Sequence, residues 1–130
     1  MSKELIHVLF LAAGSDGEVQ KEELDLIRHY RTYYPSLQNI TQEEYELEVA
    51  KLFNQVSSGI ESQFILAQLG QNLSQEQKNS GYALAVEVCA SNFAIVPPET
   101  DLLAEIRDIW KINDKVRDAV DLSVRLRYAV

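Results

Sequence analysis

Apolar residues recur at spacings of three and four along almost the whole chain, and no stretch shows the sustained alternation of a half-buried β-strand. This period matches the α-helix, so we expect an all-α fold. Apolar residues make up 46% and charged residues 25% of the 130 positions, which is ordinary for a globular protein of one core. We therefore predict a single helical domain spanning residues 1–130.

Start and stop signals divide this pattern into helices joined by short connections. Pro35 ends the second helix, because the residue before a proline avoids helical backbone angles. Thr41 with Glu44, and Ser74 with Gln77, have the spacing of capping boxes. We expect seven helices in a compact bundle, over residues 3–13, 20–34, 41–57, 60–70, 74–90, 96–110 and 113–130.

The fifth helix contains "GYALAVEVCA", which is apolar almost all round. A helix with no polar face is typically buried on every side, so this segment is predicted to be the central helix of the bundle. Its small residues Ala83, Ala85 and Ala90 would let a neighbouring backbone approach closely.

An internal repeat relates the two halves of the chain. When Val19 is placed over Val96, an offset of 77, Glu22 lies over Glu99 and Leu26 lies over Leu103. Each half then reads as a small-residue helix, a short loop, a hydrophobic residue and an acidic helix start. The loops differ in chemistry, because Asp-Gly-Glu at 16–18 faces Phe-Ala-Ile at 93–95.

Two motifs make the chain resemble a known family. The first is A-A-x-x-D-G-E-V-x-x-E-E-L near the N-terminus, and the second is C-A-x-x-x-x-x-V-x-x-E-x-x-L in the later half. Together with the helical end "RDAVDLSVRLRYAV", they resemble the tellurite-resistance TerB-like family over nearly the whole chain. The resemblance implies an all-α, pseudo-twofold bundle in which the two loop-and-helix units lie close together.

The resemblance also implies an acidic cluster that binds a divalent metal. By position, Asp16 matches the aspartate of the first Asp-Gly pair, and Glu22 and Glu99 match the acids of the following helices. Glu18 adds a further carboxylate beside Gly17, which permits the turn. The metal site predicted here is Asp16, Glu18, Glu22 and Glu99, with calcium or magnesium expected rather than zinc. Phe93-Ala94 stands where the second Asp-Gly pair would be, so half of a two-loop site is missing.

A second interpretation of the first acidic loop needs no ligand. Carboxylates near a helix start complement its positive dipole end and accept hydrogen bonds from free amides. The loop also lacks the alternating acids and distant glutamate of an EF-hand. A helix corner and a cation site are both compatible with "SDGE".

Net charge and apolar run lengths limit the partners. A formal charge of -8 disfavours nucleic acid and anionic membranes, since both are bound through clustered Lys and Arg. The apolar runs are far shorter than the roughly 20 residues that cross a bilayer, and the N-terminus lacks a signal-peptide pattern. We expect a cytoplasmic protein without direct membrane insertion. Its oligomeric state is not determined by the sequence.

The sequence contains only weak candidates for a catalytic site. Glu22, Asp25 and His29 lie at helical spacings and could ligate zinc, but such triplets are common on a solvated helix face. His7 and Cys89 could form a nucleophilic dyad, yet Cys89 falls in the most apolar helix, where cysteine behaves as a small hydrophobe. Phosphate-binding glycine loops, Gly-x-Ser-x-Gly, His-Glu-x-x-His and paired CxxC motifs are absent from the sequence. We therefore predict that the protein is not an enzyme.

Two apolar stretches are candidates for contact with a protein partner. "HYRTYY" at 29–34 is either a binding surface or the rim of the core with its hydroxyls in water. Phe93 and Ile95 are either an exposed patch or, as we expect, tucked onto the core.

The function predicted first is that of a non-enzymatic TerB-like protein in a metal- or envelope-stress system of the tellurite-resistance type. We expect a protein partner and a weak cation site at the first acidic loop. The family resemblance implies that the complex with this partner is tied to a membrane. The alternative is a helical protein–protein interaction module with no ligand.

Overall fold

The computed structural model describes residues 3–15, 17, 19–35, 37–91 and 94–129. Over these ranges it contains seven α-helices and no strands, so the all-α prediction is confirmed. The helices are α1 (Glu4–Ala13), α2 (Lys21–Tyr33), α3 (Gln42–Ser57), α4 (Ser62–Gly70), α5 (Gln75–Ala90), α6 (Pro97–Ile109) and α7 (Asp114–Tyr128).

Side-chain caps explain where several helices begin. The Glu44 amide donates to Thr41 Oγ1 at 3.1 Å, and the Thr41 amide donates back to Glu44 Oε1 at 3.2 Å. Ser74 and Gln77 repeat this arrangement at the start of α5. Each capping box satisfies amides that have no partner within the first turn. The two capping boxes expected from the sequence are confirmed.

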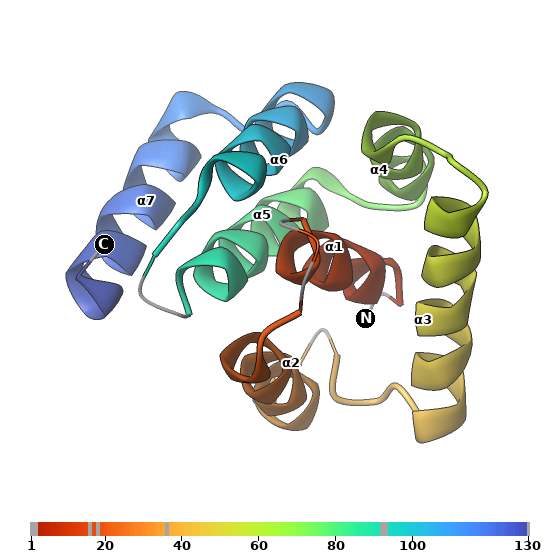
Figure 1. Cartoon of the computed structure of the whole chain (residues 1–130). Helices are drawn as coiled ribbons and strands as arrows, with labels where there is room; N and C mark the ends of the chain where they lie inside the picture. Colours follow the sequence, from red (N-terminus) through yellow and green to blue (C-terminus); the bar gives the residue numbers. More distant parts are fainter. Residues whose placement is uncertain (1–2, 16, 18, 36, 92–93, 130) are drawn as a thin grey trace.

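Helices α1 and α5 pack against each other at the centre of the molecule (Figure 1). Helix α5 also contacts α2, α6 and α7, as expected for the central helix. Gly81 of α5 makes room for this packing, because a Cβ there would lie 2.9 Å from Leu5 and 3.0 Å from the Trp110 ring. The Trp110 indole N–H donates to the Leu66 carbonyl at 2.8 Å, which joins the core to α4.

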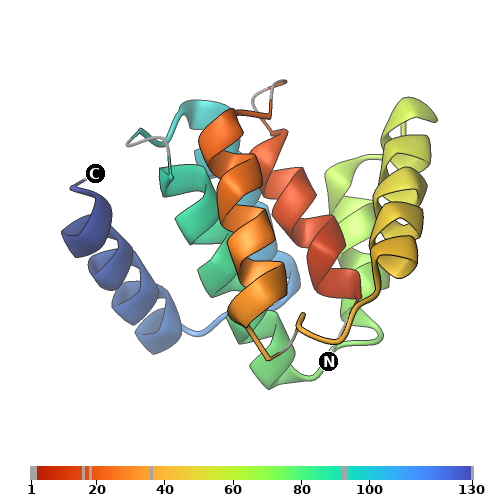
Figure 2. The ribbon, with the colours of Figure 1, turned by 90° about the horizontal axis from the view of Figure 1, so that it is seen from below.

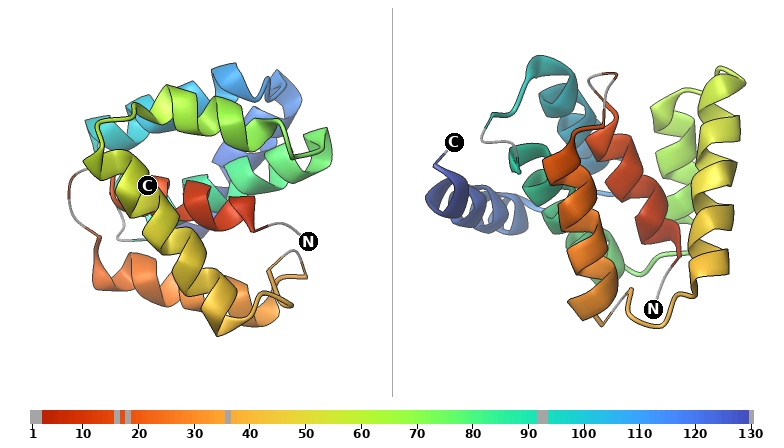
Figure 3. Two further views of the ribbon diagram at one scale, coloured as in Figure 1. Left: turned by 90° about the vertical axis from the view of Figure 1, so that its right-hand side faces the viewer. Right: turned by 60° about the horizontal axis from the view of Figure 1, so that its bottom comes forward.

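The remaining helices surround this pair. Helix α3 packs on α1, α4 packs on α6 and α1, and α7 packs on α5. Helices α7 and α3 lie at opposite edges of the molecule in the views of Figures 1 and 2 and again in the right-hand view of Figure 3. This arrangement leaves much of α3 and α7 exposed.

A buried carboxylate joins three helices. Glu87 of α5 accepts a hydrogen bond from the Tyr30 hydroxyl of α2 and pairs with the Arg127 guanidinium of α7. Burial and the hydrogen bond to Glu87 both raise the pKa of Tyr30. Tyr30 is fully buried, so neither interpretation of "HYRTYY", a binding surface or a water-facing rim, applies to this tyrosine, whereas Tyr33 is exposed.

The repeat is present in the structure, but its register changes between the helices. Ala13 ends α1 and Ala90 ends α5, which fits the offset of 77. The following connections span residues 14–20 and 91–96, so the second is one residue shorter. Glu99 in the third position of α6 therefore corresponds to Glu23 of α2, and the predicted pairing with Glu22 is wrong.

Candidate functional site

The predicted cation site is only partly within the described residues. Asp16 and Glu18 lie outside them. Gly17 has a φ of 92°, the left-handed turn expected of this glycine, and Glu22 is exposed in the first turn of α2. In the described part of the chain, His, Cys, Asp and Glu side chains form no group of three or more that could hold a metal.

Glu99, the fourth predicted ligand, is fully buried and caps its own helix. Its Oε1 accepts a hydrogen bond from the Val96 amide at 3.0 Å. Glu23 does the same at the start of α2, where its Oε1 accepts from the Gln20 amide at 2.7 Å. The matched carboxylates of the two halves thus stabilise the two helix starts. In the sequence, the signal for the correspondence between Glu23 and Glu99 is that each glutamate lies three residues after its N-cap.

The side chains proposed for zinc or for a nucleophilic dyad have other neighbours. Asp25 pairs with Arg28 at 3.6 Å, and His29 packs against Tyr33 with ring centroids 4.8 Å apart. Cys89 is buried, and its Sγ lies 3.9 Å from the Ala12 carbonyl oxygen. It acts as a small core residue, as the sequence pattern favoured. Ile95 packs against the core as expected, whereas Phe93 lies outside the described residues.

His7 has a partner that the sequence pattern did not indicate. It lies inside α1 with 5% of its surface exposed, rather than at a frayed helix start. Its Nε2 is 2.6 Å from Oε2 of Glu48, and Lys51 Nζ lies 3.3 Å from Oε1 of the same carboxylate. Because an ionised carboxylate only accepts hydrogen bonds, Nε2 of His7 donates the proton.

The His7–Glu48 pair lines a polar cleft between α1, α3 and α4. This histidine cleft has a volume of about 490 Å³. Burial raises the pKa of Glu48, but hydrogen bonds from His7 and Lys51 outweigh that effect and hold the pKa below its ordinary value of 4.5. The pair therefore contains an ionised carboxylate at neutral pH and fastens α3 to α1.

The histidine cleft offers no hydroxyl or thiol nucleophile in the part of the chain that the structure describes. Its lining residues there include no serine, threonine, tyrosine or cysteine. Nδ1 of His7, the nitrogen not used by Glu48, is buried without a hydrogen-bond partner, so a substrate would not reach it in this conformation. The remaining lining side chains are Lys3, Glu4, Lys51, Asn54, Gln55, Ile65, Gln68, Leu69 and Asn72.

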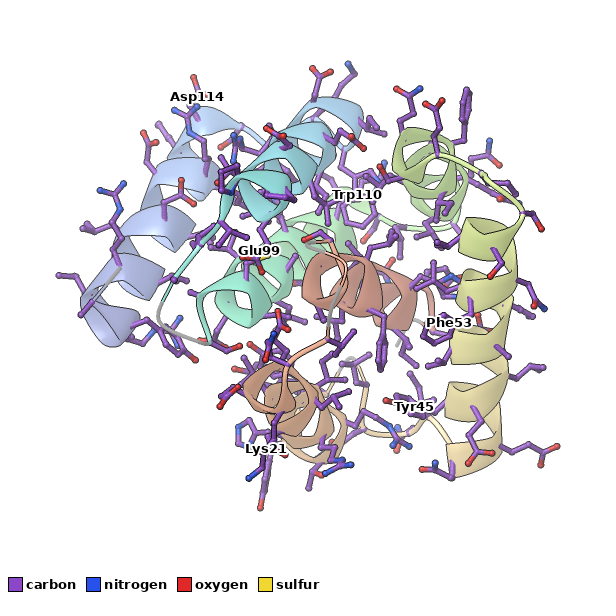
Figure 4. The ribbon with its side chains drawn as sticks, in the orientation of Figure 1. Lys21, Tyr45, Phe53, Glu99, Trp110 and Asp114 are labelled. Atoms are coloured by element: carbon purple, nitrogen blue, oxygen red, sulfur yellow. The ribbon has the colours of Figure 1, made fainter. Side chains whose placement is uncertain are left out.

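A second depression, the apolar groove, lies between α1, α3, α4 and α6 and has a volume of about 460 Å³. Its sides include Val56 and Ile60, which are 51% and 43% exposed. Among the described residues, the charged side chains of its lining are both acidic, Asp101 and Glu105. The rest of the lining is Phe10, Leu11, Gly14, Ser15, Leu52, Ser62, Ile65, Pro98 and Leu102. Figure 4 shows side chains from α1, α3 and α4 converging on this side of the molecule.

The apolar groove can hold apolar side chains and attract a basic flank. Exposed apolar surface rimmed by charge is typical of a protein-binding site. The individual groove residues look like ordinary helix-face residues in the sequence. They come from segments as far apart as Phe10 and Glu105, so only the fold brings them together.

No helix among the described residues combines the length and apolar character required to cross a membrane. Comparison of the chain with protein-family models, with curated proteins and with solved structures finds no match.

Proposed function

We propose that this chain is a non-enzymatic helical docking protein that binds an amphipathic helix of a protein partner in the apolar groove. The observation that carries this proposal is the exposure of Val56 and Ile60 beside an apolar floor, with Asp101 and Glu105 as the charged lining residues. An amphipathic helix that enters such a groove buries side chains at spacings of three and four. Acidic lining favours a helix with Lys or Arg beside those side chains.

The non-enzymatic part of the proposal is supported by the histidine cleft. Among the described residues its lining supplies no hydroxyl or thiol nucleophile, Lys51 pairs with Glu48, and the nitrogen of His7 that does not contact Glu48 is buried. The His7–Glu48 pair holds α3 against α1, and this structural role explains why the two side chains lie together.

The cellular setting of the proposal rests on the resemblance to the TerB-like family. On that basis the partner belongs to a metal- or envelope-stress assembly of the tellurite-resistance type, on the cytoplasmic side of a membrane. The repeated helix–loop–helix with equivalent glutamates, Glu23 and Glu99, agrees with the two-unit organisation of that family.

The groove is tested with a fluorescein-labelled synthetic helix that has leucines at spacings of three and four and lysines on its flanks. Fluorescence anisotropy measures its binding to the wild type and to the Val56→Glu/Ile60→Glu variant. Carboxylates in the apolar contact should weaken binding at least about tenfold, because they lose hydration on burial. Leu47→Glu is the matched control, since Leu47 is also exposed on α3 but does not line the groove. Equal binding by the groove variant, or no saturable binding to the wild type, would overturn the proposal.

A cation site at the first acidic loop is the second candidate. The left-handed turn at Gly17 and the exposed position of Glu22 in the first turn of α2 favour this candidate. Calorimetric titration of calcium, magnesium, manganese and zinc into chelator-treated protein tests it, alongside Asp16→Asn/Glu22→Gln. Saturable binding at micromolar metal or tighter, lost in the double variant, supports the site. Absent binding, or binding unchanged in the variant, leaves the loop as a helix corner.

A further inference from the structure

Helix α7 has a second apolar face that points away from the core. Its buried residue is Val124, with Val116 and Val120 packed partly against the core. On the opposite side, Leu122 and Leu126 are 59% and 76% exposed. Together with Lys115 and Ala119, which are also exposed, they follow the spacing of four, three and four that places residues on one helix face. These residues are termed the α7 stripe.

The charge beside the α7 stripe changes along the helix. Asp114, Asp118 and Asp121 flank its first half together with Lys115, whereas Arg125 makes its last turn basic. The leucine end of the stripe therefore has features that the apolar groove should recognise: leucines four residues apart and a positive charge next to them.

The groove and the α7 stripe lie on different sides of the molecule. Helix α7 is at one edge, whereas α3 and α4, which form two sides of the groove, are at the other (Figure 1). The view in Figure 2 shows the same separation of α7 from α3. A molecule folded in this way cannot place its own α7 in its own groove, so any such contact joins two molecules.

We propose that the α7 stripe of one copy docks into the apolar groove of a second copy. The proposal rests on the proposed function, because it uses the same groove and names its occupant. Leu122 and Leu126 enter between α3, α4 and α6, and Arg125 faces the acidic lining of Asp101 and Glu105. The contact joins two different surfaces, so it is heterologous: each molecule offers a groove at one edge and a stripe at the other.

The overall charge of the chain opposes association but does not prevent it. A net charge of -8 makes two copies repel each other at long range. At about 0.15 M salt the screening length is about 8 Å, so charges near the contact dominate. There the groove is acidic, and Arg125 gives the leucine end of the stripe a positive charge. A single helix in a groove is a small interface, so we expect a weak, concentration-dependent association.

Sedimentation velocity over about 5 to 500 µM protein tests the proposal, because this range covers weak interfaces. The wild type should shift from monomer to larger species as its concentration rises. Leu122→Glu/Leu126→Glu and Val56→Glu/Ile60→Glu should each remain monomeric over the same range. Leu47→Glu, an exposed leucine outside both surfaces, should behave as the wild type. Helical circular dichroism and Trp110 fluorescence check that each variant is folded.

Mixing the two double variants separates a head-to-tail contact from a symmetric one. Each variant keeps one intact surface, so an equimolar mixture should form dimers that stop at two copies. A mixture that stays monomeric overturns the proposal. So does association of the groove variant alone, which would indicate a symmetric contact between two α7 helices, and so does a wild type that is monomeric throughout.

Failure of this inference differs from failure of the proposed function. If the synthetic helix binds the groove but the wild type does not self-associate, the groove docks a different partner and only the second-copy proposal is overturned. If the synthetic helix does not bind either, the groove itself is not a docking site.

Discussion

The central pair α1 and α5 differs sharply from the edge helices α3 and α7. Seven of the ten residues of α1 are buried, whereas α3 buries two of sixteen and α7 one of fifteen. The edge helices nevertheless carry apolar side chains, including Phe53, Leu122 and Leu126, that remain exposed. Folding free energy is therefore concentrated at the centre, and the surface available for binding is concentrated at the edges.

The largest loss of stability should follow removal of the Trp110 ring at the centre. Trp110→Ala leaves a cavity beside Gly70 and Gly81 and is expected to lower the free energy of unfolding by about 3–5 kcal/mol. Urea unfolding followed by circular dichroism measures this. Trp110→Phe, which keeps an aromatic ring but loses the bond to the Leu66 carbonyl, should lose less. Equal losses in the two variants would show that the hydrogen bond, rather than packing, dominates.

Adding atoms at the centre should also destabilise the fold. In Gly81→Ala the new Cβ would lie 2.9 Å from the Leu5 side chain and 3.0 Å from the Trp110 ring. Overpacking of this kind costs about 1–3 kcal/mol, which exceeds the gain of up to about 1 kcal/mol in helix propensity. Thermal unfolding measures the result, with the exposed Ser80→Ala as control. A more stable Gly81→Ala protein would mean that the side chains around position 81 move to accept the added methyl group at little cost in free energy.

A variant that breaks the His7–Glu48 pair tests how much this contact contributes to holding α3 against α1. Glu48→Gln removes the ionised acceptor and should lower stability at pH 7 by about 1–3 kcal/mol. Because folding lowers the pKa of Glu48, its stabilising effect is complete above pH 4.5 and disappears as the pH falls below that value. The free energies of unfolding of the wild type and of Glu48→Gln should differ at pH 7, and this difference should be smaller at pH 3. A constant difference would contradict the assigned role of the carboxylate.

Loss of a cap on the edge helix should have a smaller effect. Thr41→Ala removes the oxygen that accepts from the Glu44 amide, and about 1 kcal/mol is the typical loss for such a cap. Hydrogen exchange should increase in the first turns of α3 before it does in α1 or α5. Thr32→Ala, at an exposed position within α2, is the control. Uniform exchange through all helices would mean that edge and centre unfold together.

The smallest effect on stability should come from the α7 stripe. Leu126→Glu changes a side chain that is largely in solvent, so the unfolding free energy should change by no more than about 0.5 kcal/mol. The same variant should weaken self-association, which sedimentation measures independently. A large loss of stability would show that Leu126 contributes to the core and not to an interface.

The sequence by itself determined the helices and most of their ends. Thr41 with Glu44, Ser74 with Gln77, and Asn113 are local signals, because a cap bonds to amides two or three residues away. The central position of α5 was also predictable, since an all-apolar helix has no face to present to water. These features depend on neighbours within one or two helical turns.

Only the tertiary structure decided which side chains share a site. Glu48 lies 41 residues from His7, and on α3 it looks like one more carboxylate among several. One residue less in the second connection shifts the partner of Glu99 from Glu22 to Glu23, and the match of Val19 with Val96 in the two motifs conceals this shift. The apolar groove gathers residues from four helices and the connections between them. Spacing along a helix fixes which face a residue occupies, but the packing of that face against distant helices determines what the residue contacts.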